Sequence, residues 1–206
     1  MITATQLKLF EIFAKMPFAQ ITRKEIKLYS KQKSNNALAL TINLLKQEEV
    51  IIEEKIGKSG LLSLNLENDL TYHYIALCNH TRLAHLAMLS LKHLTHEISQ
   101  YTHFYAIVVF GSYSIGEQKK DSDLDVAVFI EQESQRKEIK AIANSAQLKS
   151  ILEMDVHIIT KNEMIEMLTN KDENLGKQIA RKHMAIYNQR IFYDIILEGM
   201  EHGFRI

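Results

Sequence analysis

Apolar side chains recur at helical spacing along the first part of the chain. Phe10 and Phe13 lie on one face of a predicted first helix, which ends near Pro17. Thr22 stands three residues before Glu25, and this capping-box spacing predicts the start of a second helix. The chain therefore opens with short amphipathic helices.

A third helix and a hairpin are predicted to complete residues 1–70. Ser34 or Asn35 can cap a helix rich in leucine. The stretch VIIEEKIGKSGLLSLNL then alternates with a period of two around Gly57-Lys58-Ser59-Gly60, which predicts a hairpin. Three short helices followed by a hairpin resemble a winged helix-turn-helix domain with its third helix in the recognition position.

Residues 71–103 contain neither glycine nor proline and predict one long connecting helix. Six of the nine histidines fall in this stretch. The spacing of His93 and His96 would let them share a metal ion, but no carboxylate or cysteine completes an obvious ligand set. The alternative is that these histidines are polar surface.

Two apolar runs in the last part of the chain predict strands. Residues 105–110 are fully apolar and predict a buried strand, and residues 124–130 predict a second one. Asp123 and Asp125 share one face of the second strand, near its start. A third run, from residue 151 to 159, carries Asp155, and pairing it with the second strand would bring the three carboxylates together.

Three carboxylates within about 4 Å of one another would each cost several kcal/mol by repulsion at an effective dielectric constant near 20. Protonation with raised pKa values would relieve this cost, and so would a bound divalent cation. Because the ligands are all oxygens, Mg²⁺ or Mn²⁺ is the expected metal.

An EF-hand calcium loop is the competing metal interpretation, since Asp121, Asp123 and Asp125 match its first three ligands. Val126 occupies the position that requires glycine, and Gln132 stands where the bidentate glutamate belongs. The sequence therefore argues against calcium in an EF-hand.

The segment FGSYSIGEQKKDSDLDVAVFI resembles the signature of the nucleotidyltransferases of the DNA polymerase β superfamily, in particular the minimal stand-alone ones. That signature has a Gly-Ser at a strand end, a further glycine, an Asp-x-Asp opening the next strand and a third acidic residue on a later strand. The positions are filled in order by Gly111, Ser112, Gly116, Asp123, Asp125 and Asp155. The resemblance covers roughly residues 104–190.

The resemblance implies an α+β fold with a small mixed-sheet, polymerase β-like domain. It implies that Asp123, Asp125 and Asp155 are catalytic and hold Mg²⁺ or Mn²⁺. It also implies that Gly111, Ser112 and Gly116 bind the nucleotide. The implied reaction moves AMP from ATP onto a hydroxyl of an acceptor. The stand-alone type looks most like antitoxins that adenylylate a partner toxin.

Two positions depart from the family pattern. Tyr113 stands where many relatives carry a basic residue, and Ser114 stands where alanine is usual. Other basic residues could reach a triphosphate or could simply be solvated, namely Lys119, Lys120, Lys161, Lys177, Arg181 and Lys182. His157 lies on the face of Asp155 and could contact substrate or form a structural hydrogen bond.

The predicted domains are a winged helix-turn-helix domain at 1–70, a connecting helix at 71–103 and a nucleotidyltransferase domain at 104–206. The chain of 206 residues has a formal net charge of zero, which argues against nucleic-acid binding over its whole surface. Residues 1–70 carry ten Lys and Arg against eight Asp and Glu, a net charge of +2. The basic residues that could contact DNA phosphates are Arg23, Lys24, Lys27, Lys31, Lys33 and Lys58. The alternative function is therefore a DNA-binding transcriptional regulator whose transferase domain only senses nucleotide or docks a partner.

The cysteine count and the lengths of the apolar runs indicate the expected cellular compartment. Cys78 is the single cysteine, so an intramolecular disulfide is excluded and a reducing cytoplasm is expected. No signal peptide and no run of about 18 apolar residues are visible, so no membrane partner is expected. The sequence leaves the oligomeric state open, with a homodimer as one possibility.

Overall fold

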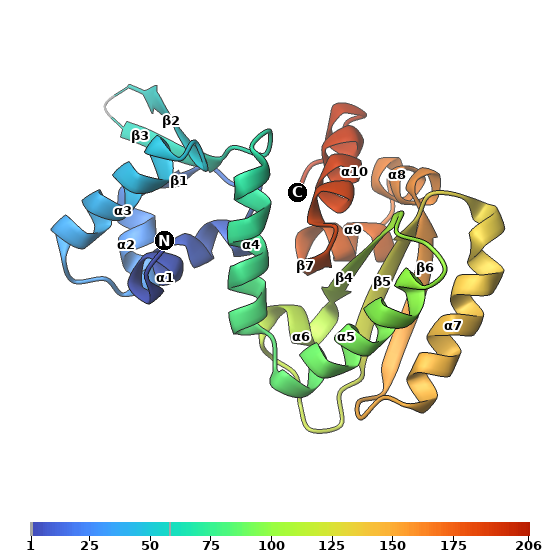
Figure 1. The fold of residues 1–206 in the computed structure, drawn as a ribbon. Coiled ribbons are helices and arrows are strands. Elements are labelled where there is room, and N and C mark those ends of the chain that lie inside the picture. The colour runs from blue at the N-terminus through green and yellow to red at the C-terminus, as the bar shows by residue number, and fades with distance from the viewer. Residues whose placement is uncertain (1, 58) are drawn as a thin grey trace. The chain divides into compact units, whose positions relative to one another are not determined.

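The computed structural model describes residues 2–57 and 59–206, and the chain divides into two compact units, Met1–Asn79 and His80–Ile206 (Figure 1). Lys58, at the tip of the predicted hairpin, lies outside the described residues.

The first unit consists of helices and a small antiparallel sheet. Its helices are α1 (Ala4–Lys15), α2 (Arg23–Ser30), α3 (Asn35–Gln47) and the greater part of α4 (Asp69–Arg82). Its strands are β1 (Ile21–Thr22), β2 (Ile51–Ile56) and β3 (Ser59–Leu64), in the sheet order β1-β3-β2. The pairing of Ile56 with Ser59 confirms the predicted hairpin.

Both predicted helix caps of the first unit are confirmed. The Thr22 side chain accepts a hydrogen bond from the Glu25 backbone N–H, and the Glu25 carboxylate accepts one from the Thr22 N–H at 2.7 Å. Ser34 caps α3 by accepting from the N–H of Ala37. These bonds satisfy N–H groups that a helix start leaves without a helical partner.

The prediction of one helix over residues 71–103 is wrong. The stretch contains the end of α4 and a separate helix α5 (His85–Ser99), with a break at Leu83 and Ala84. Ala84 has ψ 141°, and Leu83 is buried in the core of the second unit. The absence of glycine and proline permits a helix, but burial of Leu83 outweighs that local preference.

The second unit is built on a four-stranded mixed sheet in the order β6-β5-β4-β7. The strands are β4 (Tyr105–Phe110), β5 (Leu124–Ile130), β6 (Met154–Thr160) and β7 (His183–Tyr187). β6 runs parallel to β5, whereas β4 is antiparallel to both of its neighbours. The bounds predicted for β4 and β5 are confirmed, but β6 begins three residues later than predicted because Ile151 is exposed.

Helices cover both faces of this sheet (Figure 1). One face packs against α5 and α7 (Arg136–Leu148), and the core there includes Leu91, Leu94, Val126 and Ile139. α8 (Lys161–Thr169) and α10 (Gln189–Glu201) pack together, and α10 contacts β4 and β7. The remaining helices are α6 (Gly111–Ile115), the 3₁₀ turn η1 (Glu133–Gln135) and α9 (Leu175–Arg181).

Within the described residues, no helix has both the length and the apolar character needed to cross a membrane.

His183, at the start of β7, is buried beside Phe192 and Tyr193. Its Nδ1 lies 3.0 Å from the carbonyl oxygen of Ala180, so Nδ1 carries the proton of the neutral ring. Burial lowers the pKa of His183 to about 4, even though backbone carbonyls favour the charged form.

We expect this histidine to make the fold sensitive to acid. Its pKa is lower in the folded protein than the ordinary 6.5, so the unfolded chain takes up the proton first as the pH falls. The resulting loss should develop between pH 6.5 and about 4 and reach about 3 kcal/mol. Urea unfolding at several pH values measures it, with His183→Phe as the variant that lacks the titration. An identical pH dependence in the variant and the natural protein would contradict this prediction.

Candidate active site

The three predicted carboxylates lie at one end of the sheet because of strand register. Leu124 and Val126 are buried toward α5 and α7, so Asp125 between them faces the other side of β5, and Asp123 lies just before the strand. In the parallel pairing of β5 with β6, Asp125 and Asp155 are direct partners. Neighbouring strands lie roughly 4.8 Å apart, so the register confirms the predicted approach of Asp155 to Asp125.

The pKa of the Asp125 carboxyl is raised above its ordinary range. Its burial contributes most, and the charge of Asp155 raises the pKa further. His157 opposes the rise, and Asp123 adds a smaller increase. The site therefore holds negative charges that repel one another, and either protonation or a bound cation relieves this repulsion.

Gly111 has to be glycine for two separate reasons. It follows β4 directly, opens α6 and has φ +62°, in the left-handed region. A Cβ placed on it would overlap Oδ2 of Asp125. The turn after β4 is thus pressed against the carboxylate of β5.

Helix α6 is held in place by contacts from distant parts of the chain. The Ser114 hydroxyl donates to the carbonyl oxygens of Gly111 at 2.8 Å and of Lys182 at 3.2 Å. Arg82 donates from Nη2 to the Ser114 carbonyl oxygen at 2.9 Å. Gly116 ends the helix with φ +77°. Ser112 is thereby carried on a short helix that is anchored at its far end.

The sequence did not indicate the Arg82 contact, because Arg82 lies on α4, 32 positions from its partner. Arg82 is the last residue of α4, and nothing in the neighbouring sequence indicates this contact. Ser114 stands where the family pattern has alanine, and its hydroxyl links α6 to the residue before β7.

His157 makes a hydrogen bond to the candidate site. Its Nε2 lies 3.0 Å from Oδ2 of Asp155, and its ring lies 5.7 Å from that of Phe110. The structural hydrogen bond considered for His157 is therefore present. It orients the Asp155 carboxylate toward His157, two residues further along β6.

Three of the six basic residues that could reach a triphosphate are engaged elsewhere. Lys161 pairs with Glu198 at 2.5 Å, and Arg181 pairs with Glu173 at 2.6 Å. Lys177 is buried and donates to two backbone carbonyl oxygens of the loop before α9. These three side chains therefore stabilise α8 and α9, since their charges are compensated locally.

Lys182 is the basic residue that the fold places next to the carboxylate end. It is exposed, and its neighbour His183 pairs with Phe110 at the end of β4. Lys119 and Lys120 are also exposed, in the loop before β5. Tyr113, which replaces a basic residue of the family pattern, is buried in the core.

The donor set suits a hard cation, although the side chains do not enclose one as they stand. Among the described residues, no three His, Cys, Asp or Glu side chains converge into a metal-binding group. The register nevertheless brings Asp125 and Asp155 together, and Asp155 is turned onto His157. Carboxylate oxygens are the ligands that suit Mg²⁺ or Mn²⁺.

Residues 95–184 match the family model of the nucleotidyltransferase domain, and this range contains every candidate site residue named above from Gly111 to His157. None of the curated proteins matches the chain. A solved structure titled "Crystal structure of the toxin-antitoxin with AMP-PNP" is 21% identical over 54% of this chain and 81% of that chain, with a TM-score of 0.34.

The two reasons for glycine at position 111 can be separated by mutation. Gly116→Ala should lose about 1 kcal/mol of unfolding free energy through its positive φ alone, because no atom lies within 4 Å of the added Cβ. Gly111→Ala should lose clearly more, since the same strain is joined by the overlap with Asp125. Urea unfolding of both variants measures the difference. Equal losses would show that Asp125 moves aside freely.

Proposed function

We propose that this chain, whose residues 95–184 form a nucleotidyltransferase domain, moves AMP from ATP onto a hydroxyl of an acceptor. The observation that carries the proposal is the pairing of Asp125 with Asp155, together with the raised pKa of Asp125. Carboxylates that repel one another at the end of a buried sheet favour the binding of cations. Phosphoryl transfer requires such cations beside the triphosphate.

Asp123, Asp125 and Asp155 would hold Mg²⁺ or Mn²⁺. When bound, the metal neutralises charge that develops on the phosphates and lowers the pKa of the attacking hydroxyl. Asp125, the more buried of the three, is held by β5 and by the turn at Gly111. Asp155 is oriented by His157, on the strand at the edge of the sheet.

The turn after β4 would bind the triphosphate. The Ser112 hydroxyl and the N–H groups of Gly111 and Ser112 would contact the β- and γ-phosphates, and the exposed Lys182 would add positive charge at this end of the sheet. The acceptor oxygen forms a bond to the α-phosphorus while the bond to the bridging oxygen breaks, and pyrophosphate leaves. The hydroxyl proton would pass to water beside the exposed Asp155 carboxylate.

A partner protein is the acceptor class that this site favours, as in the antitoxin-like enzymes that the signature resembles. The Asp155 side chain is 60% exposed on an edge strand, so a large acceptor can approach it. Leu148 and Ile151 are 89% and 68% exposed in the segment that leads to β6, at the same end of the sheet. Exposed apolar side chains beside a site are typical of protein contact surfaces.

The first unit supports a second candidate function, binding of DNA. Its helices α1 to α3 and its hairpin have the order of a winged helix-turn-helix domain. Lys24 and Lys27 line a hollow beside the start of α3, and Lys24 is exposed. Arg23 forms an ion pair with Glu53 at 3.1 Å, so its charge is less available to bind a DNA phosphate.

The transfer itself is tested with labelled nucleotide. We expect an acceptor in a cell extract to be labelled from [α-³²P]ATP and not from [γ-³²P]ATP, because pyrophosphate leaves. Asp123→Asn combined with Asp125→Asn should lower labelling at least about a hundredfold and weaken Mg²⁺-dependent ATP binding in calorimetry. Asp121→Asn, an exposed carboxylate outside β5, is the matched control and should behave as the natural protein. Label from the γ-phosphate would instead indicate a kinase.

DNA binding is tested by its salt dependence. If Lys24, Lys27, Lys31 and Lys33 contact phosphates, the slope of log K against log salt should be about −3 to −4. Lys24→Ala should reduce the slope by about one, whereas Lys15→Ala, on α1 and paired with Glu11, should not change it. Mobility shifts on the DNA upstream of the gene measure both. No shift at about 50 mM salt would leave the first unit as a protein-docking module.

A further inference from the structure

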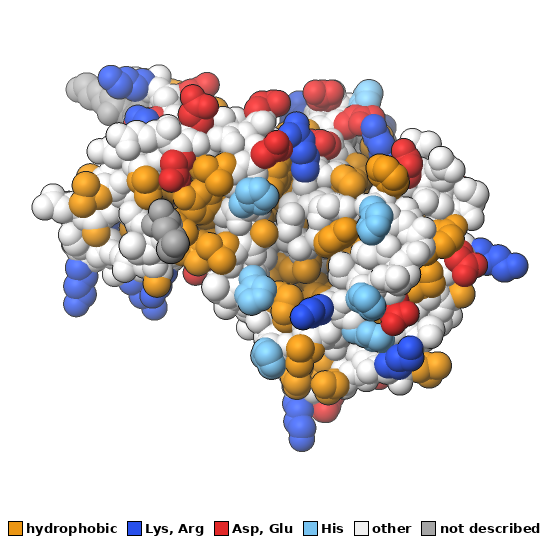
Figure 2. Space-filling view, viewed as in Figure 1, with side chains coloured by type: hydrophobic (Ala, Val, Ile, Leu, Met, Phe, Trp, Pro, Cys, Tyr) orange, Lys and Arg blue, Asp and Glu red, His pale blue; other side chains and the backbone are white. Residues whose placement is uncertain are grey.

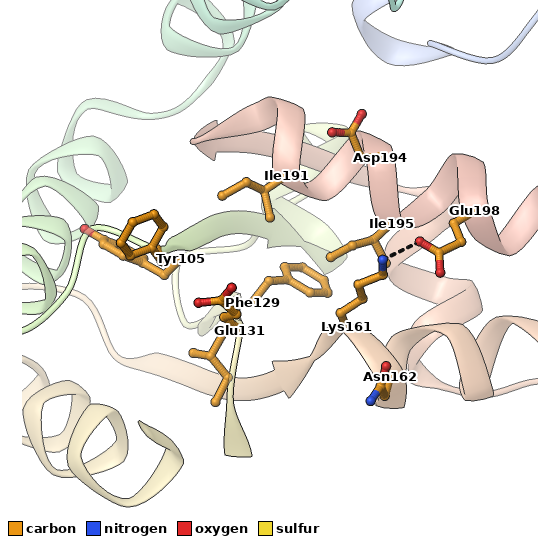
Figure 3. A pocket seen from close by; sticks show the side chains of 11 residues that line it. Tyr105, Phe129, Glu131, Lys161, Asn162, Ile191, Asp194, Ile195 and Glu198 are labelled. Carbon is orange, nitrogen blue, oxygen red and sulfur yellow. Dashed lines mark ion pairs between the residues drawn. The ribbon is translucent and has the colours of Figure 1, made fainter. Parts of the chain in front are cut away.

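A cavity of about 330 Å³ lies between the sheet and helices α8 and α10 (Figure 3). Its lining includes Tyr105, which begins β4, and Ile130, which ends β5. Asp125 lies near the other end of β5, roughly 16 Å away along the strand. The cavity is therefore separate from the candidate active site.

The floor of the cavity is apolar. Ile191 and Ile195 extend from α10 toward the ring of Phe129 (Figure 3). Phe104, which also lines the cavity, is 69% exposed, and Ile191 is 36% exposed. A ligand that covered these two side chains would remove apolar surface from water.

The charged residues around the cavity leave an excess of negative charge. In Figure 2, apolar side chains are bordered by acidic and basic ones over the region of α8 and α10. Lys161, the basic residue of the lining, is neutralised by Glu198 at 2.5 Å, and Asp194 lies 3.7 Å from Arg190. Glu131 has no ion-pair partner among the residues that the structure describes.

We propose that this cavity binds a small organic ammonium ion. Its aromatic or branched apolar body would lie on Phe129, Ile191 and Ile195, and its ammonium group would lie toward Glu131. A carboxylate attracts the ammonium directly, and the exposed ring of Phe104 at the mouth adds cation–π attraction. The volume is at the lower end of the range for small-molecule sites, so it suits a ligand with one ring and a short chain.

The test uses phenethylammonium chloride and the full chain with ¹³C-labelled isoleucine methyl groups. We expect saturable shifts of the Ile191 and Ile195 methyl signals in NMR titrations. Phenylacetate, which has the ring but the opposite charge, should bind at least tenfold more weakly, and so should ethylammonium, which has the charge but no ring. Equal binding of phenethylammonium and phenylacetate, or no saturable shift up to about 50 mM, would overturn the proposal.

A pair of variants tests the part played by Glu131. Glu131→Gln, at an exposed position, should lower the affinity for phenethylammonium at least threefold. Glu138→Gln removes the same charge from an exposed position on α7, which covers the other face of the sheet, and should leave the affinity unchanged. The methyl spectrum of each variant also reports whether it is folded. Unchanged binding in Glu131→Gln would overturn the assignment of the ammonium position.

Discussion

The parallel register of β5 with β6 is the constraint on which the candidate site depends. Leu124, Val126 and Val128 are buried against α5 and α7, so the alternate positions of β5 must face the other side. Asp155 is the partner of Asp125 only in this register. A slip of one residue would place a carboxylate in the core and a leucine in the site.

The same constraint explains how the chain tolerates charges that repel one another. Burial of the strands stabilises the sheet far more than repulsion between the carboxylates destabilises it. The packing of the strands therefore determines where the carboxylates lie. Burial raises the pKa of Asp125, and the neighbouring charge of Asp155 raises it further. Gly111 permits this arrangement, because any side chain there would displace the Asp125 carboxylate. β5 and the turn at Gly111 hold Asp125 in place, whereas the Asp155 carboxylate is turned onto His157.

The two ends of the sheet offer different chemistry on the same face. Asp125 and Asp155 lie where β5 and β6 begin, and the apolar cavity with Glu131 lies where β5 ends. The helices on that face keep most of their basic residues in local ion pairs or backbone contacts, as with Lys161 and Lys177. Among the described residues, Lys182 is exposed at the carboxylate end, as are Lys119 and Lys120 in the loop before β5.

The sequence by itself determined β4, β5 and the face of the aspartates, because an unbroken apolar run and a period of two are local properties. The caps at Thr22 and Ser34 were equally local. Tertiary structure alone decided the break at Leu83, the burial of Lys177 and the contact of Arg82 with Ser114. It also decided the cavity beside α10. Each of these depends on which elements pack together, and periodicity shows that a face is apolar without showing what covers it.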